Sequence, residues 1–211
     1  MAKQRSRRDA NLRRQLAYSA ARMIAQDGAD YATAKRKAAS QAGLADANLL
    51  PDNQEIEEAL REYQELYQKE DQPAHLRHLR EVAVKVMREF EGFRPALVGA
   101  VLSGTAGQFS DVNLHLYTDD PKALSMFLLN KRYRFEEGTK RVQRGGRFDE
   151  VPQISLQVDD VTVTMTVLDP DDERSAARLR AGDDAPLRAR LAEVEALLSP
   201  SGGEPLPARN R

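Results

Sequence analysis

The sequence predicts an α+β protein in which an N-terminal helical region is followed by a mixed sheet with flanking helices. Apolar residues recur at helical spacing through residues 1–92, whereas short apolar runs and strict alternation follow from residue 93. The 211 residues are 41% hydrophobic, which suffices for a core and excludes a wholly disordered chain. We therefore expect a helical region over 1–92, an α/β domain over 93–198 and a disordered tail over 199–211.

Composition excludes several classes of protein. No stretch approaches the roughly 18 uncharged apolar residues that a membrane helix needs, and the N-terminal MAKQRSRRD lacks the apolar segment of a secretory signal. Cysteine is absent, so disulfides, thiolate metal sites and cysteine nucleophiles are excluded. We expect a soluble cytoplasmic protein without a membrane partner, and the sequence leaves its oligomeric state open.

The formal net charge of −1 conceals an asymmetry along the chain. Residues 1–48 hold ten basic and four acidic residues, which leaves the remainder of the chain acidic. A basic arm can hold nucleic acid by neutralising phosphates. A solvated helix face that improves solubility has the same composition, so both interpretations stay open.

Four segments of the N-terminal region have helical patterns with recognisable ends. Gly28 and Gly43 follow two of them as stop signals, and Asp52 with Glu55 three positions later has the form of a capping box. Pro73 opens the fourth, whose apolar stripe runs to Gly92. The expected helices are residues 9–27, 32–42, the segment after Asp52, and 73–92.

The second half of the chain has the pattern of strands with helices between and after them. The first expected strand is a short apolar run, as in a buried strand, and the second alternates strictly between apolar and polar residues. The last two flank Asp159 and Asp160 in the pattern of a hairpin, with threonines on the outward side of the final strand. The expected strands are 97–102, 111–117, 154–158 and 161–167, and helices are expected from Pro121 and over 186–198.

The segment 102–116 holds the residues that indicate chemistry. A buried strand is expected to run into Gly104 and Thr105, where the glycine lets a phosphate approach the backbone and the threonine offers a hydroxyl beside helix-terminal N–H groups. Asp111 and Asn113 lie two residues apart on the next expected strand, so their oxygen atoms share one face. Such ligands suit Mg²⁺, which takes the rest of its shell from water and substrate phosphates.

This segment resembles the signature of the nucleotidyltransferase superfamily, the fold shared with DNA polymerase beta and small bacterial nucleotidyltransferases. The signature is Gly-Ser or Gly-Gly after a hydrophobic strand, followed about ten residues later by Asp-x-Asp. Gly104-Thr105 and Asp111-Val112-Asn113 match it, and the resemblance covers roughly residues 80–168. It implies catalytic and metal-ligating roles for Asp111 and Asn113, and nucleotide-binding roles for Ser103, Gly104, Thr105 and Ser110. Lys131 and Arg132 are expected to bind the nucleotide because of their positive charge.

The whole chain further resembles a group of small proteobacterial proteins that carry the name UDP-N-acetylmuramate–alanine ligase. Such a ligase binds ATP through a glycine-rich loop that ends in Gly-Lys-Thr or Gly-Lys-Ser, and this chain contains no such loop. It also needs several domains, for which 211 residues are too few. The nucleotidyltransferase resemblance is therefore the one that we carry forward.

The match lacks two of the carboxylates that the family uses. The resemblance implies three carboxylates that hold two Mg²⁺ ions, which activate the attacking hydroxyl and neutralise the leaving pyrophosphate. Asn113 stands at the second position and Thr164 is expected at the third, so only Asp111 is ionised. His115 continues the same polar row and is expected, with Thr164, to line the cleft. Fewer charged ligands weaken the binding of a divalent cation.

Two hypotheses for the function follow. An enzyme would move a nucleotide from an NTP to a hydroxyl with Mg²⁺ held by Asp111 and Asn113. A degenerate binding module would hold a nucleotide, RNA or a protein partner without turnover, and the neutral residues favour it. Asp159, Asp160 and Asp169 could replace the missing carboxylates, although such turn and strand-end positions normally serve the turn itself.

A basic segment over Lys131–Arg147 offers a second contact for anions. It holds seven basic and two acidic residues, and Tyr133 and Phe135 interleave the charges, which would allow stacking on a nucleic acid or contacts with a triphosphate. An exposed edge strand that is protected by charge has the same composition, so both interpretations stay open.

Residues 15–44 resemble the first two helices of TetR-type repressors. That resemblance implies a recognition helix after Leu44, which would enter the major groove of DNA. Only residues 45–50 separate Leu44 from Pro51, too few for such a helix. A DNA-binding regulator that uses the basic N-terminal helices is therefore a third hypothesis, beside a plain helical hairpin.

Overall fold

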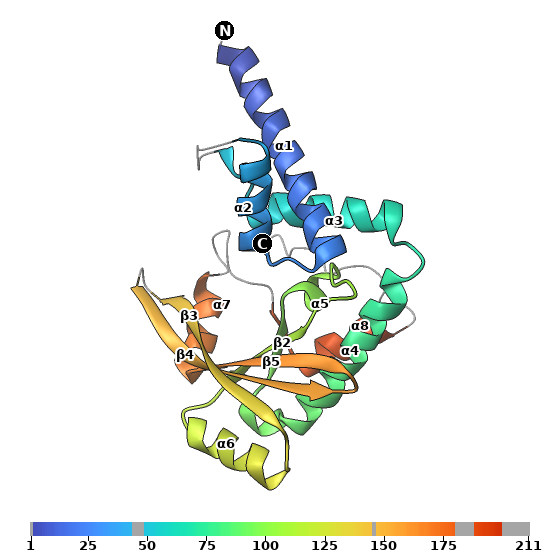
Figure 1. Cartoon of the computed structure of the whole chain (residues 1–211). Coiled ribbons are helices and arrows are strands. Elements are labelled where there is room, and N and C mark those ends of the chain that lie inside the picture. The colour runs from blue at the N-terminus through green and yellow to red at the C-terminus, as the bar shows by residue number, and fades with distance from the viewer. Residues whose placement is uncertain (1, 44–48, 145–146, 180–187, 200–211) are drawn as a thin grey trace. The chain divides into compact units, whose positions relative to one another are not determined.

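The chain divides into two compact units in the structure, a computed structural model that describes residues 2–43, 49–144, 147–179 and 188–199 (Figure 1). The helical unit contains Met1–His75 and the short segment Gly107–Ser110. The sheet unit contains Leu76–Ala106 and Asp111–Arg211. The α+β class that the sequence predicts is confirmed, and each unit is described below by itself.

The helical unit is built from three helices around an alanine-rich core. They are α1 (Ala2–Asp27), α2 (Tyr31–Gln41) and α3 (Asn53–Tyr67). The small side chains of Ala20, Ala21 and Ala34 are fully buried, which lets the helices approach closely, and the larger Ile56 and Leu60 of α3 fill the centre of this core. The expected helices are confirmed, and α1 begins earlier than residue 9.

The capping box expected at α3 is present. The Asp52 carboxylate accepts a hydrogen bond from the Glu55 N–H at 2.8 Å, and the Glu55 carboxylate accepts one from the Asp52 N–H at 2.8 Å. The guanidinium of Arg13 on α1 also donates to the Glu55 carboxylate at 2.8 Å. One glutamate therefore both starts α3 and joins it to α1.

The segment Gly107–Ser110 belongs to the helical unit although it lies between two elements of the sheet unit in sequence. Phe109 packs against Gly28, where a Cβ atom would lie only 2.7 Å from the Cβ of Phe109. Gly28 also has a φ of +65°, so both space and backbone favour glycine there.

The sheet unit contains a six-stranded mixed sheet in the order β3-β4-β5-β2-β1-β6. Strands β2 and β5 run parallel, and all other neighbours are antiparallel. The two-residue turn at Asp159 and Asp160 joins β4 to β5, and both residues have positive φ values of 50° and 62°, as a tight hairpin turn requires. The strands are β1 (Ala96–Val98), β2 (Val112–Tyr117), β3 (Phe135–Arg144), β4 (Arg147–Val158), β5 (Val161–Leu168) and β6 (Arg188–Ala189).

Helices cover one face of this sheet and form the main core with it. Leu114 of β2 and Met165 of β5 are fully buried beside Leu79, Leu128 and Val194 from three different helices. The helices of the unit are α4 (Gln72–Glu89, in this unit from Leu76), α5 (Ala100–Ser103), α6 (Pro121–Asn130), α7 (Pro170–Leu179) and α8 (Leu191–Leu198), and a 3₁₀ turn η2 spans Glu91–Phe93. The opposite face carries the polar residues of the alternating strands.

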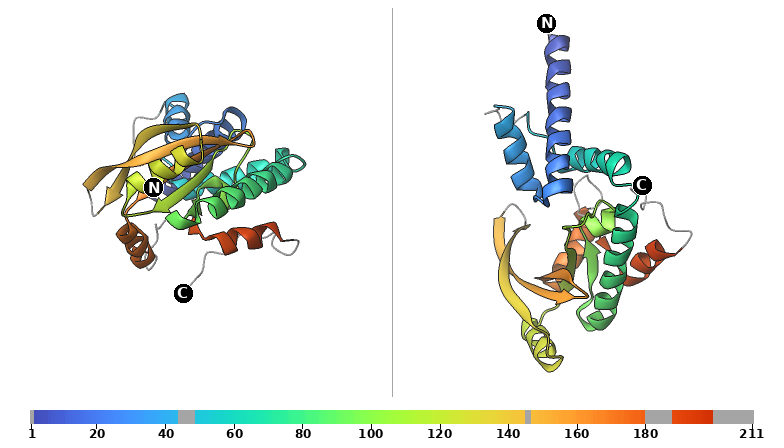
Figure 2. Two further views of the ribbon diagram at one scale, coloured as in Figure 1. Left: turned by 90° about the horizontal axis from the view of Figure 1, so that it is seen from below. Right: turned by 45° about the vertical axis from the view of Figure 1, so that its right-hand side comes forward.

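The β3–β4 hairpin extends beyond the rest of the sheet. Strand β3 pairs over its full length with residues 147–156 of β4, whereas β5 pairs with β4 only from Gln153 to Val158. The right-hand view of Figure 2 shows this hairpin curving along its length. The expected strand 154–158 is therefore the end of a longer strand, and the basic segment before it is mostly β3.

Two elements differ from the expectation. The strand expected over 97–102 ends at Val98, because Gly99 has a φ of +76° and the apolar residues that follow form the short helix α5. The helix expected over 186–198 begins at Leu191, since Arg188 and Ala189 pair with β1 as the edge strand β6. Leu187 lies outside the described residues, and α7 was not expected from the sequence.

Helix α4 packs with the sheet. From Leu79 to Phe90, its apolar side chains lie in the main core of the sheet unit. The boundary at residue 92 stays a prediction about independently folding domains, and nearly all of the tail expected over 199–211 lies outside the described residues. Among the described helices, none combines the length and apolarity that crossing a membrane requires.

Candidate functional site on the polar face of the sheet

Of the residues expected to carry chemistry, Asn113, His115 and Thr164 lie on the face of the sheet that faces away from α4. Asn113 of β2 lies directly opposite Thr164 of β5, which in turn lies opposite Ser155 of β4. The hydroxyl oxygens of Ser155 and Thr164 are 3.4 Å apart. The structure therefore places Thr164 beside Asn113, at the position where the resemblance implies a third carboxylate.

Asp111 is the one carboxylate at this end of β2. Partial burial raises the pKa of its side chain, and a hydrogen bond with the Thr162 side chain opposes that rise. The Nδ2 of Asn113 donates to the backbone carbonyl of Asp111 at 3.3 Å. Asp111 therefore contributes one carboxylate at this end of β2, hydrogen-bonded to the neighbouring β5.

These side chains do not fit the pair of Mg²⁺ ions that the resemblance implies. The donor set is one carboxylate, one amide and several hydroxyls, and charge count governs the affinity of oxygen sites for divalent cations. Within the part of the chain that the structure describes, no cluster of three or more His, Asp or Glu residues could hold a metal. The expected metal roles of Asp111 and Asn113 thus gain no support.

The other aspartates do not supply the missing carboxylates. Asp159 lies in the β4–β5 turn and pairs with Lys85 at 2.7 Å, and Asp160 occupies the same turn. Asp169 accepts the N–H of Asp171 at 2.8 Å at the start of α7. Each serves the local turn or helix end, as turn chemistry predicts.

The glycine beside the polar pair is Gly99, not Gly104. Gly99 follows β1 directly, and a Cβ atom there would lie 3.9 Å from both Cβ and Nδ2 of Asn113. Gly104 instead ends α5 with a φ of +89° and lies close to the buried Arg80, whose guanidinium would be 3.7 Å from a Cβ atom. Gly99 lies within the apolar run 97–102 and Gly104 lies two residues after it, so the sequence alone did not separate them.

The phosphate cradle expected around Gly104 is occupied by internal hydrogen bonds. The N–H groups of Gly104, Thr105 and Ala106 all donate to the carbonyl of Ala100, at 2.9, 3.0 and 3.1 Å. Thr105 is only 2% exposed, and its hydroxyl lies 2.9 Å from that of Ser103. This turn therefore closes α5 rather than presenting its donors to a ligand.

Ser110 is part of the helical unit. Its hydroxyl accepts the N–H of Gly107 at 3.0 Å, and its own N–H donates to the carbonyl of Gly107 at 3.0 Å. These two hydrogen bonds close the loop between Gly107 and Ser110.

Lys131 and Arg132 do not join Asp111 on the polar face. Lys131 pairs with Glu89 of α4 at 3.4 Å and lies over the ring of Phe127 at 5.6 Å, which places it with the helices that cover the other face. Arg132 is exposed at the end of α6 with a φ of +57°.

The aromatic residues of the basic segment are not free for stacking. Tyr133 and Phe135 pack against the main core, and the Tyr133 hydroxyl donates to Glu89. The exposed aromatic of the hairpin is instead Phe148, which is 61% exposed with the guanidinium of Arg141 4.7 Å above its ring.

His115 is half-buried on this face. Burial and, to a smaller extent, the charges of Lys140 and Arg188 lower its pKa from 6.5 to about 4. The imidazole is therefore neutral near pH 7. Its ring packs edge-on against Tyr117, with 6.3 Å between the centroids. The expectation that His115 lines the polar face agrees with its position opposite Thr166 on β5.

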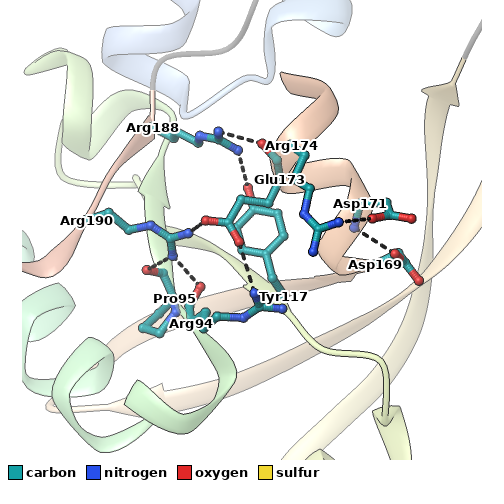
Figure 3. Close-up of polar contacts among 9 residues, drawn as sticks. All are labelled: Arg94, Pro95, Tyr117, Asp169, Asp171, Glu173, Arg174, Arg188 and Arg190. Carbon is teal, nitrogen blue, oxygen red and sulfur yellow. Dashed lines mark hydrogen bonds and ion pairs between the residues drawn. The ribbon is translucent and has the colours of Figure 1, made fainter. Parts of the chain in front are cut away.

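Arginines that the sequence analysis did not single out gather at the β6 edge of this face (Figure 3). Arg188 donates to the Tyr117 hydroxyl at 3.2 Å and to the Glu173 carbonyl at 2.8 Å. Arg190 and Arg94 both pair with the Glu173 carboxylate. Glu173 thereby ties α7 to β1 and β6. No sequence pattern links these residues, because they come together only when the short strand β6 pairs with β1.

No protein-family model and no curated protein matches the chain. Among solved structures, a poly(U) polymerase with MgGTP bound is similar at 16% identity and a TM-score of 0.30, over 44% of this chain and 32% of that one. A cytoplasmic RNA terminal U-transferase is similar at 21% identity and a TM-score of 0.28, over 47% of this chain and 30% of the other. The chain thus spans about a third of the length of each.

Proposed function

We propose that the sheet unit is a degenerate nucleotidyltransferase-like domain that binds a nucleotide or nucleic acid on its polar face without metal-dependent nucleotidyl transfer. The pairing of Asn113 with Thr164 carries this proposal. The resemblance implies ionised carboxylates at both positions, and this chain has neutral hydrogen-bonding groups there. With Asp111 as the one carboxylate beside the Asn113–Thr164 pair, this position lacks the negative charge that would hold two divalent cations against the phosphates.

The same face is suited to hydrogen bonding. Thr162, Thr164, Asn113 and Ser155 present hydroxyl and amide groups that both donate and accept, as the edges of a base and the hydroxyls of a sugar require. The apolar residues between them are buried in the main core, which holds these strands rigidly. A preorganised polar surface loses little entropy when a ligand binds.

Restoring the missing carboxylates tests the proposal. The parent protein is expected to bind an NTP as well in EDTA as in Mg²⁺. It is expected to transfer no labelled nucleotide when Mg²⁺ is added. The double variant Asn113→Asp with Thr164→Asp is expected to acquire Mg²⁺ binding, measured by isothermal titration. The matched control is Asn130→Asp with Thr139→Asp, which makes the same chemical changes at two exposed positions away from the site.

Three results would contradict the proposal. Mg²⁺-dependent nucleotide transfer by the parent protein, abolished by Asp111→Ala, would show that the domain is an active transferase. Failure of the parent to bind any nucleotide or oligonucleotide would remove the binding role. Equal gains of Mg²⁺ affinity in the double variant and its control would show that the pair is not a site.

The helical unit supports a second candidate function, nucleic-acid binding by its basic helices. Arg14 and Arg22 on α1 and Arg36 and Lys37 on α2 are all exposed, so their charges are available to phosphates. The helix after Pro51 buries its apolar side in the core of this unit. A gel shift with DNA and RNA at low salt tests this role, and Arg14→Gln with Arg22→Gln is expected to weaken any retardation.

A further inference from the structure

The outer edge of β3 is a long strand edge that has no partner among the described strands. Strand β3 stands at one end of the sheet, so one of its sides pairs with β4 and no described strand pairs with the other. The opposite edge strand, β6, has only two residues, whereas β3 has ten. The N–H and C=O groups along such an edge form a template for pairing with a further strand.

Strand β3 lacks two of the devices that usually prevent pairing at an exposed edge, namely proline and β-bulges. It contains no proline, and its register with β4 runs one residue against one residue through all ten pairs, so no bulge bends it. Residues 136–141 at its centre are all exposed. Charge is the device that remains, and the arrangement of the charges therefore determines which strand this edge can accept.

The charges of β3 are complementary to those of a second β3 strand. The acids Glu136 and Glu137 come before Gly138, and the bases Lys140 and Arg141 come after it. When two copies of this strand pair antiparallel, the acids of each lie beside the bases of the other, and such cross-strand pairs are stabilising. Within the described part of the chain, neither Glu136 nor Lys140 forms a salt bridge.

The charge pattern also selects the register of such a pairing. Residues that lie opposite each other in a sheet point to the same face, so the residue on a two-fold axis between two β3 strands lies opposite its own copy. With Gly138 on the axis, Glu136 of each copy lies opposite Lys140 of the other, and this pair forms twice. Glycine has no side chain, so the two copies do not crowd each other at the axis.

The neighbouring registers are less favourable. An axis at Glu137 or at Lys140 places two like charges directly opposite each other, which is destabilising. An axis at Thr139 brings Glu137 opposite Arg141. That guanidinium already lies over the ring of Phe148, 4.7 Å from its centre. The register centred on Gly138 therefore uses the two charges that have no salt bridge of their own.

We propose that two copies of this chain form a dimer in which their β3 edges pair antiparallel around Gly138 and join the two sheets into one. We call this contact the β3–β3 interface. Glu136 lies opposite Ser155 of β4, so the Glu136–Lys140 pairs lie on the polar face, and the polar faces of both copies continue into each other. One strand edge buries less surface than a standard interface, so the dimer dissociates on dilution. The inference is independent of the proposed ligand binding.

Sedimentation equilibrium of the full chain from about 1 μM to about 200 μM tests the dimer. The mass is expected to rise with concentration toward twice the 23.6 kDa of one chain. Lys140→Glu places acid opposite acid at two points and is expected to weaken the dimer at least about tenfold. The matched control is Lys122→Glu, the same charge reversal at an exposed residue of α6, which is expected to stay within about twofold of the parent.

Exchange of the two charges provides a rescue experiment. The double variant Glu136→Lys with Lys140→Glu reverses the order of the charges and keeps them complementary, so its dimer is expected to form within about threefold of the parent affinity. Circular dichroism checks that each variant is folded.

Cross-linking tests the register. The chain contains no cysteine, so a single introduced cysteine can form a disulfide only with another copy of the chain. In the proposed register the two Gly138 Cα atoms lie about 4.5–5.5 Å apart, a separation that a disulfide can span, and a Cβ atom at Gly138 meets nothing within 4 Å. The two copies of Thr139 lie diagonally, about 8 Å apart, which is too far. Mild oxidation is expected to cross-link Gly138→Cys and not Thr139→Cys.

Several results would overturn the inference. A chain that stays monomeric up to the highest concentration would show that charge protects the β3 edge from pairing. Dimerisation that Lys140→Glu leaves intact, or that Lys122→Glu weakens equally, would place the contact elsewhere. A folded double variant that does not regain dimerisation would show that the Glu136–Lys140 pairs do not form. Cross-linking of Thr139→Cys as readily as Gly138→Cys would overturn the register.

Discussion

Substitution of Gly99 by alanine is expected to destabilise the sheet unit through its backbone rather than through crowding. Gly99 has a φ of +76° and a ψ of −156°, a region that residues with a side chain almost never occupy. The added Cβ would not clash with its neighbours, because it would lie 3.9 Å from Asn113, an ordinary van der Waals distance. The expected cost is therefore the strain of that conformation, about 1–3 kcal/mol.

Thermal unfolding followed by circular dichroism measures this cost. In a chain of this size, 1 kcal/mol corresponds to about 2–4 °C in Tm, so Gly99→Ala is expected to lower Tm by about 2–12 °C. The control is Gly138→Ala on β3, where a Cβ would meet nothing within 4 Å and φ is not positive. Its Tm is expected to remain unchanged or to rise slightly.

The reasoning is refuted if Gly99→Ala unfolds at the same temperature as the parent protein. An equal loss in Gly138→Ala would also refute it, because the effect would then not depend on the conformation of the turn. A normal Tm for Gly99→Ala would mean that the chain can pass from β1 into α5 without a left-handed residue.

Three further predictions concern stability. Met165→Ala, at a fully buried residue, is expected to cost about 2–5 kcal/mol in urea unfolding, whereas Met126→Ala, at a residue that is 57% exposed, is expected to cost less than about 0.5 kcal/mol. Asp52→Ala removes one half of the α3 capping box and is expected to cost about 1 kcal/mol, which Asp52→Asn should largely restore. The lowered pKa of His115, about 4 in the folded protein against 6.5 in the unfolded chain, means that the unfolded chain binds the extra proton. The stability from neutral His115 is thus complete above pH 6.5 and is lost as pH falls toward 4. Between about pH 7 and about pH 4.5, His115→Gln should lose about 2 kcal/mol less than the parent, and equal losses would contradict the burial of the imidazole.

The alternating strands were predictable because alternation of apolar and polar residues is typical of a strand with one buried face. In β2 and β5 the alternation of valine or leucine with polar residues predicts both the strand and its inward face, and the structure buries Val112, Leu114 and Val163 as expected. The outward position of Thr164 follows from the same pattern. Its place directly opposite Asn113 additionally needs β2 and β5 to be neighbours, which the resemblance implied.

The segment after β1 was not predictable in the same way. The run from Leu97 to Leu102 is apolar throughout, so it fits a buried strand and a buried helix equally well. Its glycine at position 99 is the one signal of a change within the run. The correct turn changes which backbone lies beside Asn113.

The charged parts of the candidate site depend on contacts that no local pattern contains. Lys131 was expected near the nucleotide, and its pairing with Glu89 is set by the packing of α4 and α6. Arg188 reaches the polar face only because the two-residue strand β6, near the C-terminus, pairs with β1. Such long-range pairings require the tertiary structure.

The loop Gly107–Ser110 affects how fragments of this protein should be designed. Neither compact unit is an unbroken stretch of chain, since the polypeptide leaves the sheet unit after Ala106 and re-enters it at Asp111. A fragment that starts at Leu76 would carry the aromatic ring of Phe109 without the Gly28 against which it packs. Expression of the intact protein, or of fragments in which this loop is shortened or made polar, is the sounder starting point for dissecting the two halves.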